Sequence, residues 1–110
     1  MKEPDALTLL GSLANPARLS AIRALVRAGP EGLPAGTVAK AMSASPSQAS
    51  FHLANLANAG LVTSERHARE IRYRIAYERI GALIDYLFHD CCAGDPALSA
   101  CCTLPLKRKR

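Results

Sequence analysis

Residues 45–62 read SPSQASFHLANLANAGLV, and the elements predicted before and after this stretch are placed relative to it. Ser45 is suited to cap a helix, a proline at the next position suits the first helical turn, and Gln48 stands at the capping-box spacing from Ser45. Alanines and leucines then recur every three or four residues until Gly60, a residue type that commonly ends a helix. The stretch therefore predicts a capped helix that ends near Asn58 and carries polar side chains on its first turns.

Three further helices are predicted before it, over residues 5–13, 16–28 and 35–42. Asn15 and the proline after it form the start signal of the second, because asparagine can accept hydrogen bonds from the first helical N–H groups. A tight turn over residues 43–45 joins the third helix to the quoted one. The residues expected to face the core, at helical spacing, are Leu7, Leu10 and Leu13, then Leu19, Ile22, Leu25 and Val26, then Val38, Ala39 and Met42, and in the quoted helix Ala49, Leu53, Leu56 and Ala57.

Toward the C-terminus the apolar period changes from roughly 3.6 residues to roughly 2. Residues 61–67 and 71–76 are predicted to be strands joined by a tip at residues 68–70, and residues 31–34 are expected to form a loop. A last helix is predicted over residues 77–92, and its apolar residues are Ile80, Leu83, Ile84, Leu87 and Phe88. The expected fold is mainly α-helical, with four helices, a small β-hairpin and a final helix.

The 110 residues fit a single domain. We predict a folded body over residues 1–92 and a C-terminal segment over residues 93–110 that carries cysteines and a basic tail. No apolar run approaches the roughly 18 residues that a membrane-spanning helix needs, and the first residues do not resemble a signal peptide. We therefore expect a cytoplasmic protein with no membrane partner.

The charge of the chain favours a polyanionic partner, because its formal net charge is +5. Arg66, Arg69, Arg72 and Arg74 gather in the predicted hairpin, whereas the basic residues 107–110 are interpreted as a solvated tail. The sequence has no nucleotide-binding loop, no HExxH motif and no nucleophile with a placed base, so an enzyme is not expected. A DNA-binding module and a protein-interaction module remain, and retention of specific DNA in a shift assay would separate them.

Two stretches resemble one known family. Residues 46–62 resemble the recognition-helix signature of the ArsR/SmtB family of winged helix-turn-helix repressors, and residues 13–22, LANPARLSAI, resemble the start of that family's second helix. The basic hairpin follows where the family's wing would lie, and the resemblance covers roughly residues 5–90. It implies a winged helix-turn-helix fold and a homodimeric repressor that binds double-stranded operator DNA and leaves it when an inducer binds.

On this resemblance the body over residues 1–92 is a DNA-binding and dimerisation domain, and the quoted helix would enter the major groove. Its exposed first turns offer base or phosphate contacts, and the hairpin arginines offer contacts to the DNA backbone or minor groove. His52 matches the family histidine, which indicates a phosphate contact or a structural hydrogen bond. The expected DNA-binding residues are Ser47, Gln48, Ser50, Phe51, His52, Arg66, Arg69 and Arg72.

All four cysteines lie in the last 20 residues, at positions 91, 92, 101 and 102. Thiolates select soft ions, and As(III) and Sb(III) are soft ions that typically take three thiolates. We expect one of these to be the inducer, held by Cys91, Cys92 and Cys102, with Cys101 as the other possible third ligand, and we expect no organic cofactor. Some arsenite-responsive relatives carry C-terminal cysteines of this kind.

Three other interpretations of the cysteines stay open. In order, they are a tetrahedral zinc or cadmium site of four thiolates, a thiol redox switch, and cysteines with no sensing role. The helix before the recognition helix has no cysteine, so the site typical of arsenic-responsive members in that helix cannot exist here. Asp85 and His89 stand four apart on the last helix, where the family has a second type of metal site, but the expected Asp-x-His start is not present.

Overall fold

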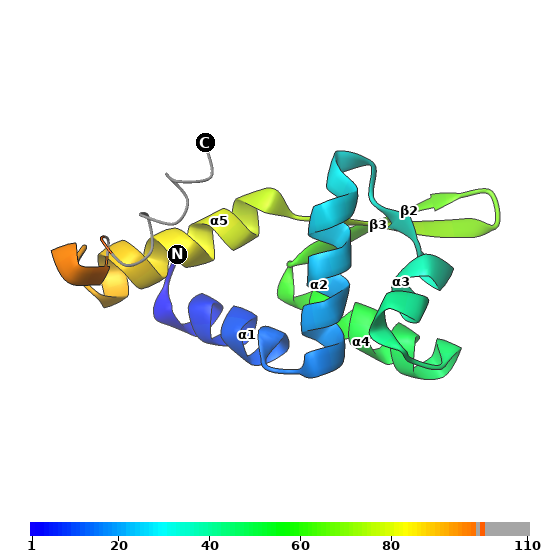
Figure 1. The fold of residues 1–110 in the computed structure, drawn as a ribbon, viewed down its shortest axis with the longest axis horizontal. Helices are drawn as coiled ribbons and strands as arrows, with labels where there is room; N and C mark the ends of the chain where they lie inside the picture. Colours follow the sequence, from blue (N-terminus) through cyan, green and yellow to red (C-terminus); the bar gives the residue numbers. More distant parts are fainter. Residues whose placement is uncertain (99, 101–110) are drawn as a thin grey trace.

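The computed structural model describes residues 1–98 and residue 100. The chain forms helices α1, α2, α3 and α4, then the hairpin of β2 and β3, and then helix α5 (Figure 1). The helices span Glu3–Leu13, Pro16–Ala28, Ala35–Met42, Pro46–Ala59 and Tyr77–Asp85, and β2 and β3 span Val62–His67 and Glu70–Ile75. This arrangement confirms the predicted fold class, a mainly helical body with a small antiparallel sheet.

The sheet has one strand that the sequence did not predict. The order is β1-β3-β2, and β1 (Leu33–Pro34) pairs with β3 through Leu33 opposite Tyr73 and Pro34 opposite Arg72. These residues follow a short 3-10 turn, η1 (Gly29–Glu31), in the segment expected to be a loop. Proline is tolerated here because β1 is an edge strand, where a missing backbone N–H costs no ladder bond. Two residues are too few to show strand periodicity.

The tip of the hairpin is shorter than expected. His67 pairs with Glu70, so only Ala68 and Arg69 remain in the turn, and Glu70 belongs to β3. Ala68 has a φ of 56°, whereas Arg69 is not among the residues with positive φ. A positive φ at the first turn position alone is the sign pattern of a type II′ hairpin turn, which usually has glycine there. The alanine explains why the turn type could not be recognised from the sequence.

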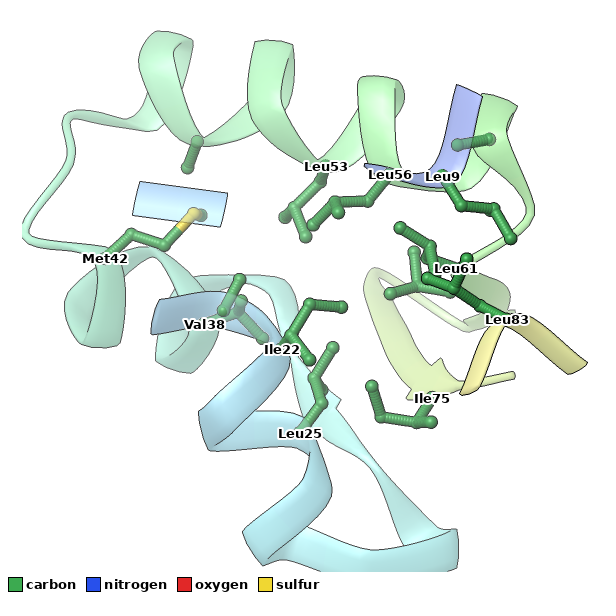
Figure 2. Packing of buried hydrophobic residues seen from close by; sticks show 14 of the residues in the cluster. Leu9, Ile22, Leu25, Val38, Met42, Leu53, Leu56, Leu61, Ile75 and Leu83 are labelled. Atoms are coloured by element: carbon green, nitrogen blue, oxygen red, sulfur yellow. The ribbon is translucent and has the colours of Figure 1, made fainter. Parts of the chain in front are cut away.

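The core lies where α2, α3, α4 and the base of the hairpin meet, and Leu9 and Leu83 bring α1 and α5 to it (Figure 2). The inward residues predicted for α3 and α4 are confirmed, because Val38, Met42, Ala49, Leu53 and Leu56 are buried and Ala39 and Ala57 pack against them. The folded body therefore has one continuous apolar centre beneath the helix-turn-helix pair.

The predicted apolar faces of α1 and α2 are partly wrong. In α1 the buried residues are Ala6, Leu9 and Ser12, whereas Leu7 and Leu10 are 59% and 37% exposed. In α2 the buried residues are Ala21, Ile22 and Leu25, whereas Leu19 and Val26 are exposed. Both helices carry apolar residues around more than one face, so periodicity alone could not choose the buried one. Packing against α4 makes that choice for α1, with the Ser12 hydroxyl donating to the amide oxygen of Asn55 at 2.5 Å.

The final helix also differs from the prediction of one α-helix over residues 77–92. Helix α5 ends at Asp85, and a π-helical segment, η2 (Tyr86–Cys91), follows it. Leu83 is buried and Ile80 and Leu87 pack against the core, but Ile84 is 62% exposed. A π-helical turn rotates the residues after it relative to an α-helical continuation, which is a change that no residue in this segment signals. Within the described part of the chain, no helix is long and apolar enough to cross a membrane.

Candidate nucleic-acid interface

The recognition helix α4 begins with the capping box that the sequence predicted. The backbone N–H of Gln48 donates to the Ser45 hydroxyl at 3.2 Å, and the backbone N–H of Ser45 donates to the side-chain oxygen of Gln48 at 3.0 Å. Two N–H groups that a helix start leaves unpaired are thus satisfied. The first turn of α4 is fixed by its own sequence, which holds the neighbouring side chains in place for a ligand.

This capping box restricts what Gln48 can do to a base. Bidentate recognition of adenine uses both the oxygen and the nitrogen of a glutamine amide. Here the oxygen accepts from Ser45, so the amide nitrogen is the group that stays available to donate outward. While the box is closed, Gln48 is suited to an acceptor on the DNA, such as a purine N7 or a phosphate oxygen. The expected adenine contact requires the oxygen to be shared or the box to open.

Four of the predicted contact residues at the start of α4 are exposed to solvent. Ser47, Gln48, Ser50 and Phe51 are all exposed, and Phe51 reaches 67%. The ring of Phe51 meets the ring of His52 edge-on, with centroids 5.5 Å apart. A large apolar ring held out in solvent at the start of α4 is suited to contact a thymine methyl group.

His52 lies half-buried and faces a partner from α2. The guanidinium Nη1 of Arg18 is 3.1 Å from His52 Nδ1, and Arg18 Nε donates to the carbonyl oxygen of Ser12 at 2.7 Å. Because the guanidinium only donates, Nδ1 must accept, and the imidazole proton sits on Nε2. Arg18 therefore joins the α1–α2 corner to the recognition helix and leaves a histidine N–H for another acceptor. Sequence reasoning missed this role of Arg18, although the residue stands in the family-like stretch at residues 13–22.

The other end of α4 is held by α5. Gly60 ends the helix in the left-handed region at a φ of 86°, and Arg79 Nη2 donates to the carbonyl oxygen of Ala59 at 3.3 Å. A Cβ at Gly60 would lie 3.0 Å from Arg79 Nε, so the guanidinium packs directly over this turn. A cation at a helix C-terminus is favourable because the last carbonyls carry partial negative charge. Nothing in the local sequence marks Arg79 for this task.

The hairpin divides its arginines between two faces. Directly paired residues of antiparallel strands share a face, and Glu65 pairs with Arg72 while Arg66 pairs with Ile71. Arg72 and Arg74 therefore lie on one face and Arg66 on the other, with Arg69 in the turn. Arg66 and Arg69 are exposed, whereas the side chains of Arg72 and Arg74 are 28% and 30% exposed. The structure does not bring the predicted wing contacts together on one surface.

The predicted metal ligands lie at the edge of what the structure describes. Cys92 is half-buried and follows η2, whereas the Cys91 side chain and the whole of Cys101 and Cys102 lie outside the described residues. His89 Nδ1 is 2.8 Å from Asp85 Oδ1, so these two side chains pair with each other. Among the side chains that the structure describes, no three of His, Cys, Asp or Glu gather as a metal site.

Comparison with known proteins agrees with this geometry. A helix-turn-helix domain model matches residues 13–65. YgaV of Escherichia coli (strain K12), a transcriptional regulator of the helix-turn-helix type, is 35% identical over 80 residues, which are 73% of this chain and 79% of YgaV. YdfF of Bacillus subtilis (strain 168), an uncharacterised regulator of the same type, is 33% identical over 88 residues, or 78% of this chain. The chain spans only 37% of the length of YdfF.

Solved structures give the same result. An ArsR-like transcriptional regulator from Rhodococcus sp. RHA1 superimposes with a TM-score of 0.70 at 25% identity, over 88% of this chain and 89% of that one. The homodimeric winged helix-turn-helix DNA-binding domain of Mb0332 from Mycobacterium bovis superimposes with a TM-score of 0.60 at 22% identity, over 79% and 84% of the two chains.

The capped recognition helix, the short turn before it and the basic hairpin after it define a winged helix-turn-helix DNA-binding protein, and not an enzyme. The chain belongs to the helix-turn-helix transcriptional regulators, and its fold is similar to that of an ArsR-like member of this class.

Proposed function

We propose that this regulator is a homodimeric repressor in the cytoplasm that leaves its operator when As(III) or Sb(III) binds to its C-terminal cysteines. The observation that carries the proposal is the position of the thiols. All four cysteines lie within 12 residues, at positions 91, 92, 101 and 102, and residues 1–90 have none. The DNA-reading surface and the thiols thus occupy different parts of the chain.

Dimerisation is supported by apolar side chains that remain exposed on α1 and α5. Leu7 is 59% exposed, Tyr77 is 50% exposed and Ile84 is 62% exposed. Both helices extend to the same side of the molecule, away from α3 and the hairpin (Figure 1). A partner that covers these residues would remove apolar surface from water, and a two-fold dimer would place two recognition helices about 34 Å apart, one turn of DNA.

Sedimentation at micromolar concentration tests the dimer. The wild-type chain should sediment as a dimer, and Ile84→Ser should shift it toward monomer. Leu19→Ser is the matched control, because Leu19 is an exposed leucine on α2 and should leave the dimer intact. A monomeric wild-type chain, or an equal effect of both substitutions, would contradict the proposed interface.

DNA contact is assigned to the start of α4 and to the exposed arginines of the hairpin. Gln48, Ser50 and Phe51 would meet base edges, Ser47 and the Nε2 of His52 would meet phosphates, and Arg66 and Arg69 would add salt-dependent affinity that does not depend on sequence. Two observations support these roles: most of these side chains are exposed, and Gln48 and His52 each keep an N–H donor that their contacts within the protein do not use.

The inducer is assigned from the chemistry of the thiols. Cys91 is the last residue of η2 and Cys92 follows it. The chain reverses directly after them, because Ala93 and Gly94 have positive φ values and the Gly94 N–H donates to the Phe88 carbonyl at 2.7 Å. A reversal here favours a third thiolate from Cys102, with Cys101 as the alternative, because the loop to be closed is short. Three soft ligands suit a pyramidal As(III) or Sb(III) ion.

Release from DNA then requires only that the ion bind more tightly to the DNA-free dimer than to the DNA-bound one. The segment η2, which ends at Cys91, continues directly from α5, and α5 carries both the proposed dimer contact Ile84 and the Arg79 contact to α4. A change at the thiols therefore has a short physical route to the spacing of the two recognition helices.

Direct ligand binding tests the assignment. The reduced, DNA-free protein is titrated with arsenite, and the loss of thiols that react with a chromogenic reagent is counted. Three thiols should be protected per chain, and one fewer in Cys91→Ser, Cys92→Ser or Cys102→Ser, while Cys101→Ser should still protect three. Zinc and cadmium are run in parallel, because protection of four thiols by these ions and none by arsenite would favour a tetrahedral site and overturn the proposal.

A further inference from the structure

The turn between α2 and β1 is pressed against strand β3. Gly29 and Gly32 have φ values of 82° and 71°, in the left-handed region that favours glycine. A Cβ on Gly32 would lie 2.1 Å from the carbonyl oxygen of Tyr73, so the two backbones are in direct contact there. This close contact places the backbone carbonyl oxygens of the turn beside the side chains of Arg72 and Arg74 on β3.

Two arginines of β3 bind those carbonyl oxygens. Arg72 Nη1 donates to the carbonyls of Glu31 and Gly32, both at 3.2 Å, and Arg74 Nε donates to the carbonyl of Pro30 at 3.1 Å. Three consecutive carbonyls are thus held by two side chains spaced two apart on one strand. Since the hairpin projects away from the helical body (Figure 1), these bonds fix strand β3 to the turn that follows α2.

Other donors of both guanidinium groups meet carboxylates of the same hairpin. Arg72 Nη2 lies 3.1 Å from Glu70 Oε2, and Arg74 Nη1 donates to Glu65 Oε1 at 2.6 Å. The Arg74 guanidinium, and after it His67, holds the pKa of the Glu65 carboxyl below its usual range. Glu65 therefore stays ionised and paired near neutral pH, and most of the charge of Arg72 and Arg74 is already matched inside the protein.

The other two hairpin arginines have no such partners. Arg66 and Arg69 are exposed, and within residues 1–98 no ion pair or side-chain hydrogen bond engages them. Arg66 lies on the opposite face of the hairpin from Arg72 and Arg74. The four arginines therefore divide into two that are committed to the protein and two that can meet phosphates.

We propose that Arg72 and Arg74 are positioning residues, which fasten the wing to the α2–β1 turn so that Arg66 and Arg69 reach the DNA backbone. Neither of the two touches DNA. This assigns to Arg72 a different role from the DNA contact that the sequence favours, and it does not depend on the identity of the inducer.

The salt dependence of binding to random-sequence duplex DNA separates the two roles. Four variants each remove one charge: Arg66→Gln, Arg69→Gln, Arg72→Gln and Arg74→Gln. Loss of a phosphate contact should lower the slope of log K against log salt by about 0.9 in the first two. The last two should keep the wild-type slope and lose affinity about threefold to tenfold, the size of one net hydrogen bond. Lys2→Gln, at the far end of α1 from the hairpin, controls for net charge.

A second readout distinguishes positioning from a purely structural role. In Arg72→Gln and Arg74→Gln, backbone ¹⁵N order parameters at Ala68 and Arg69 should fall, and Arg74→Lys should restore both tip order and affinity because lysine can still donate to the turn. A slope that falls by about 0.9 in Arg72→Gln would make Arg72 a phosphate contact. Wild-type affinity and tip order in both glutamine variants would show that the wing needs no such fastening. Either result overturns the proposal.

Discussion

The recognition helix α4 and the terminal segment α5–η2 are both amphipathic, but their ends are made differently. Helix α4 starts at a closed capping box, ends at a left-handed glycine and has its last carbonyls held by Arg79. Helix α5 starts at Tyr77, its N-cap position Ala76 provides no side-chain hydrogen bond, and the helix passes into a π-helical turn. Ile84 in the last turn of α5 is exposed, whereas Leu53 and Leu56 in the middle of α4 are buried.

Helix α4 has its ends capped and its apolar face buried within one chain, whereas α5 leaves an apolar side chain exposed. A rigid reading helix benefits from satisfied ends, because its side chains must keep a fixed position against base edges. A sensing and pairing helix needs a surface that a partner or a ligand can change. We therefore expect substitutions in α4 to act on folding and base choice, and substitutions in α5–η2 to act on association and release.

The largest expected effect is in the core beneath α4. Leu56 is fully buried, so Leu56→Ala should lower the free energy of unfolding by about 2–5 kcal/mol. Ile84→Ala is the matched α5 substitution, and in a dilute sample that is monomeric it should change that free energy by no more than about 0.5 kcal/mol. Urea denaturation followed by circular dichroism measures both. Equal losses would mean that the two helices are buried alike.

The second effect concerns base choice. Gln48→Ala should lose roughly 1–3 kcal/mol of discrimination between a selected operator and its single-base variants. Gln48→Glu is the sharper variant, because a carboxylate keeps the acceptor for the Ser45 N–H but removes both amide donors. We expect it to keep the stability of the wild type and to lose discrimination as Gln48→Ala does. Competition binding measures this, and a Gln48→Glu protein that still discriminates would remove Gln48 as a base reader.

A smaller effect tests the cap itself. Ser45→Ala removes the acceptor for the Gln48 N–H and should cost about 1 kcal/mol of stability. Ser50→Ala, an exposed serine within the same helix, should stay within about 0.5 kcal/mol of the wild type. Thermal and chemical unfolding compare the two. If both substitutions cost the same, the capping box does not stabilise α4.

An element of this fold can be predicted from the sequence when the residues that determine it lie within or next to that element. The bounds of α2 and α3 and the start of α4 follow from residues in those segments or next to them, such as Asn15 and Ser45, and the structure agrees with these predictions. Strand β1 was not predicted, because it exists only through its pairing with β3. The buried face of α1 was predicted wrongly for a related reason, since α4 selects it.

The candidate site follows the same division. The exposed start of α4 could be predicted from the family-like stretch, because exposure there follows from helical geometry. The contacts of Arg18, Arg79 and Arg72 could not, because each arginine meets a group 6 to 41 residues away in sequence. Four arginines close together in a sequence look alike until strand register places them on different faces.

The central claim is that DNA reading and ion sensing lie in separate parts of the chain, and release from DNA tests it most directly. Fluorescence anisotropy of a labelled operator is followed while arsenite is added to the reduced wild type, Cys91→Ser and Cys92→Ser. All three proteins should bind the operator equally well without arsenite. Arsenite should release the wild type and leave both variants bound. Release of the variants at wild-type arsenite concentrations, or weak operator binding by the variants before arsenite is added, would contradict the account.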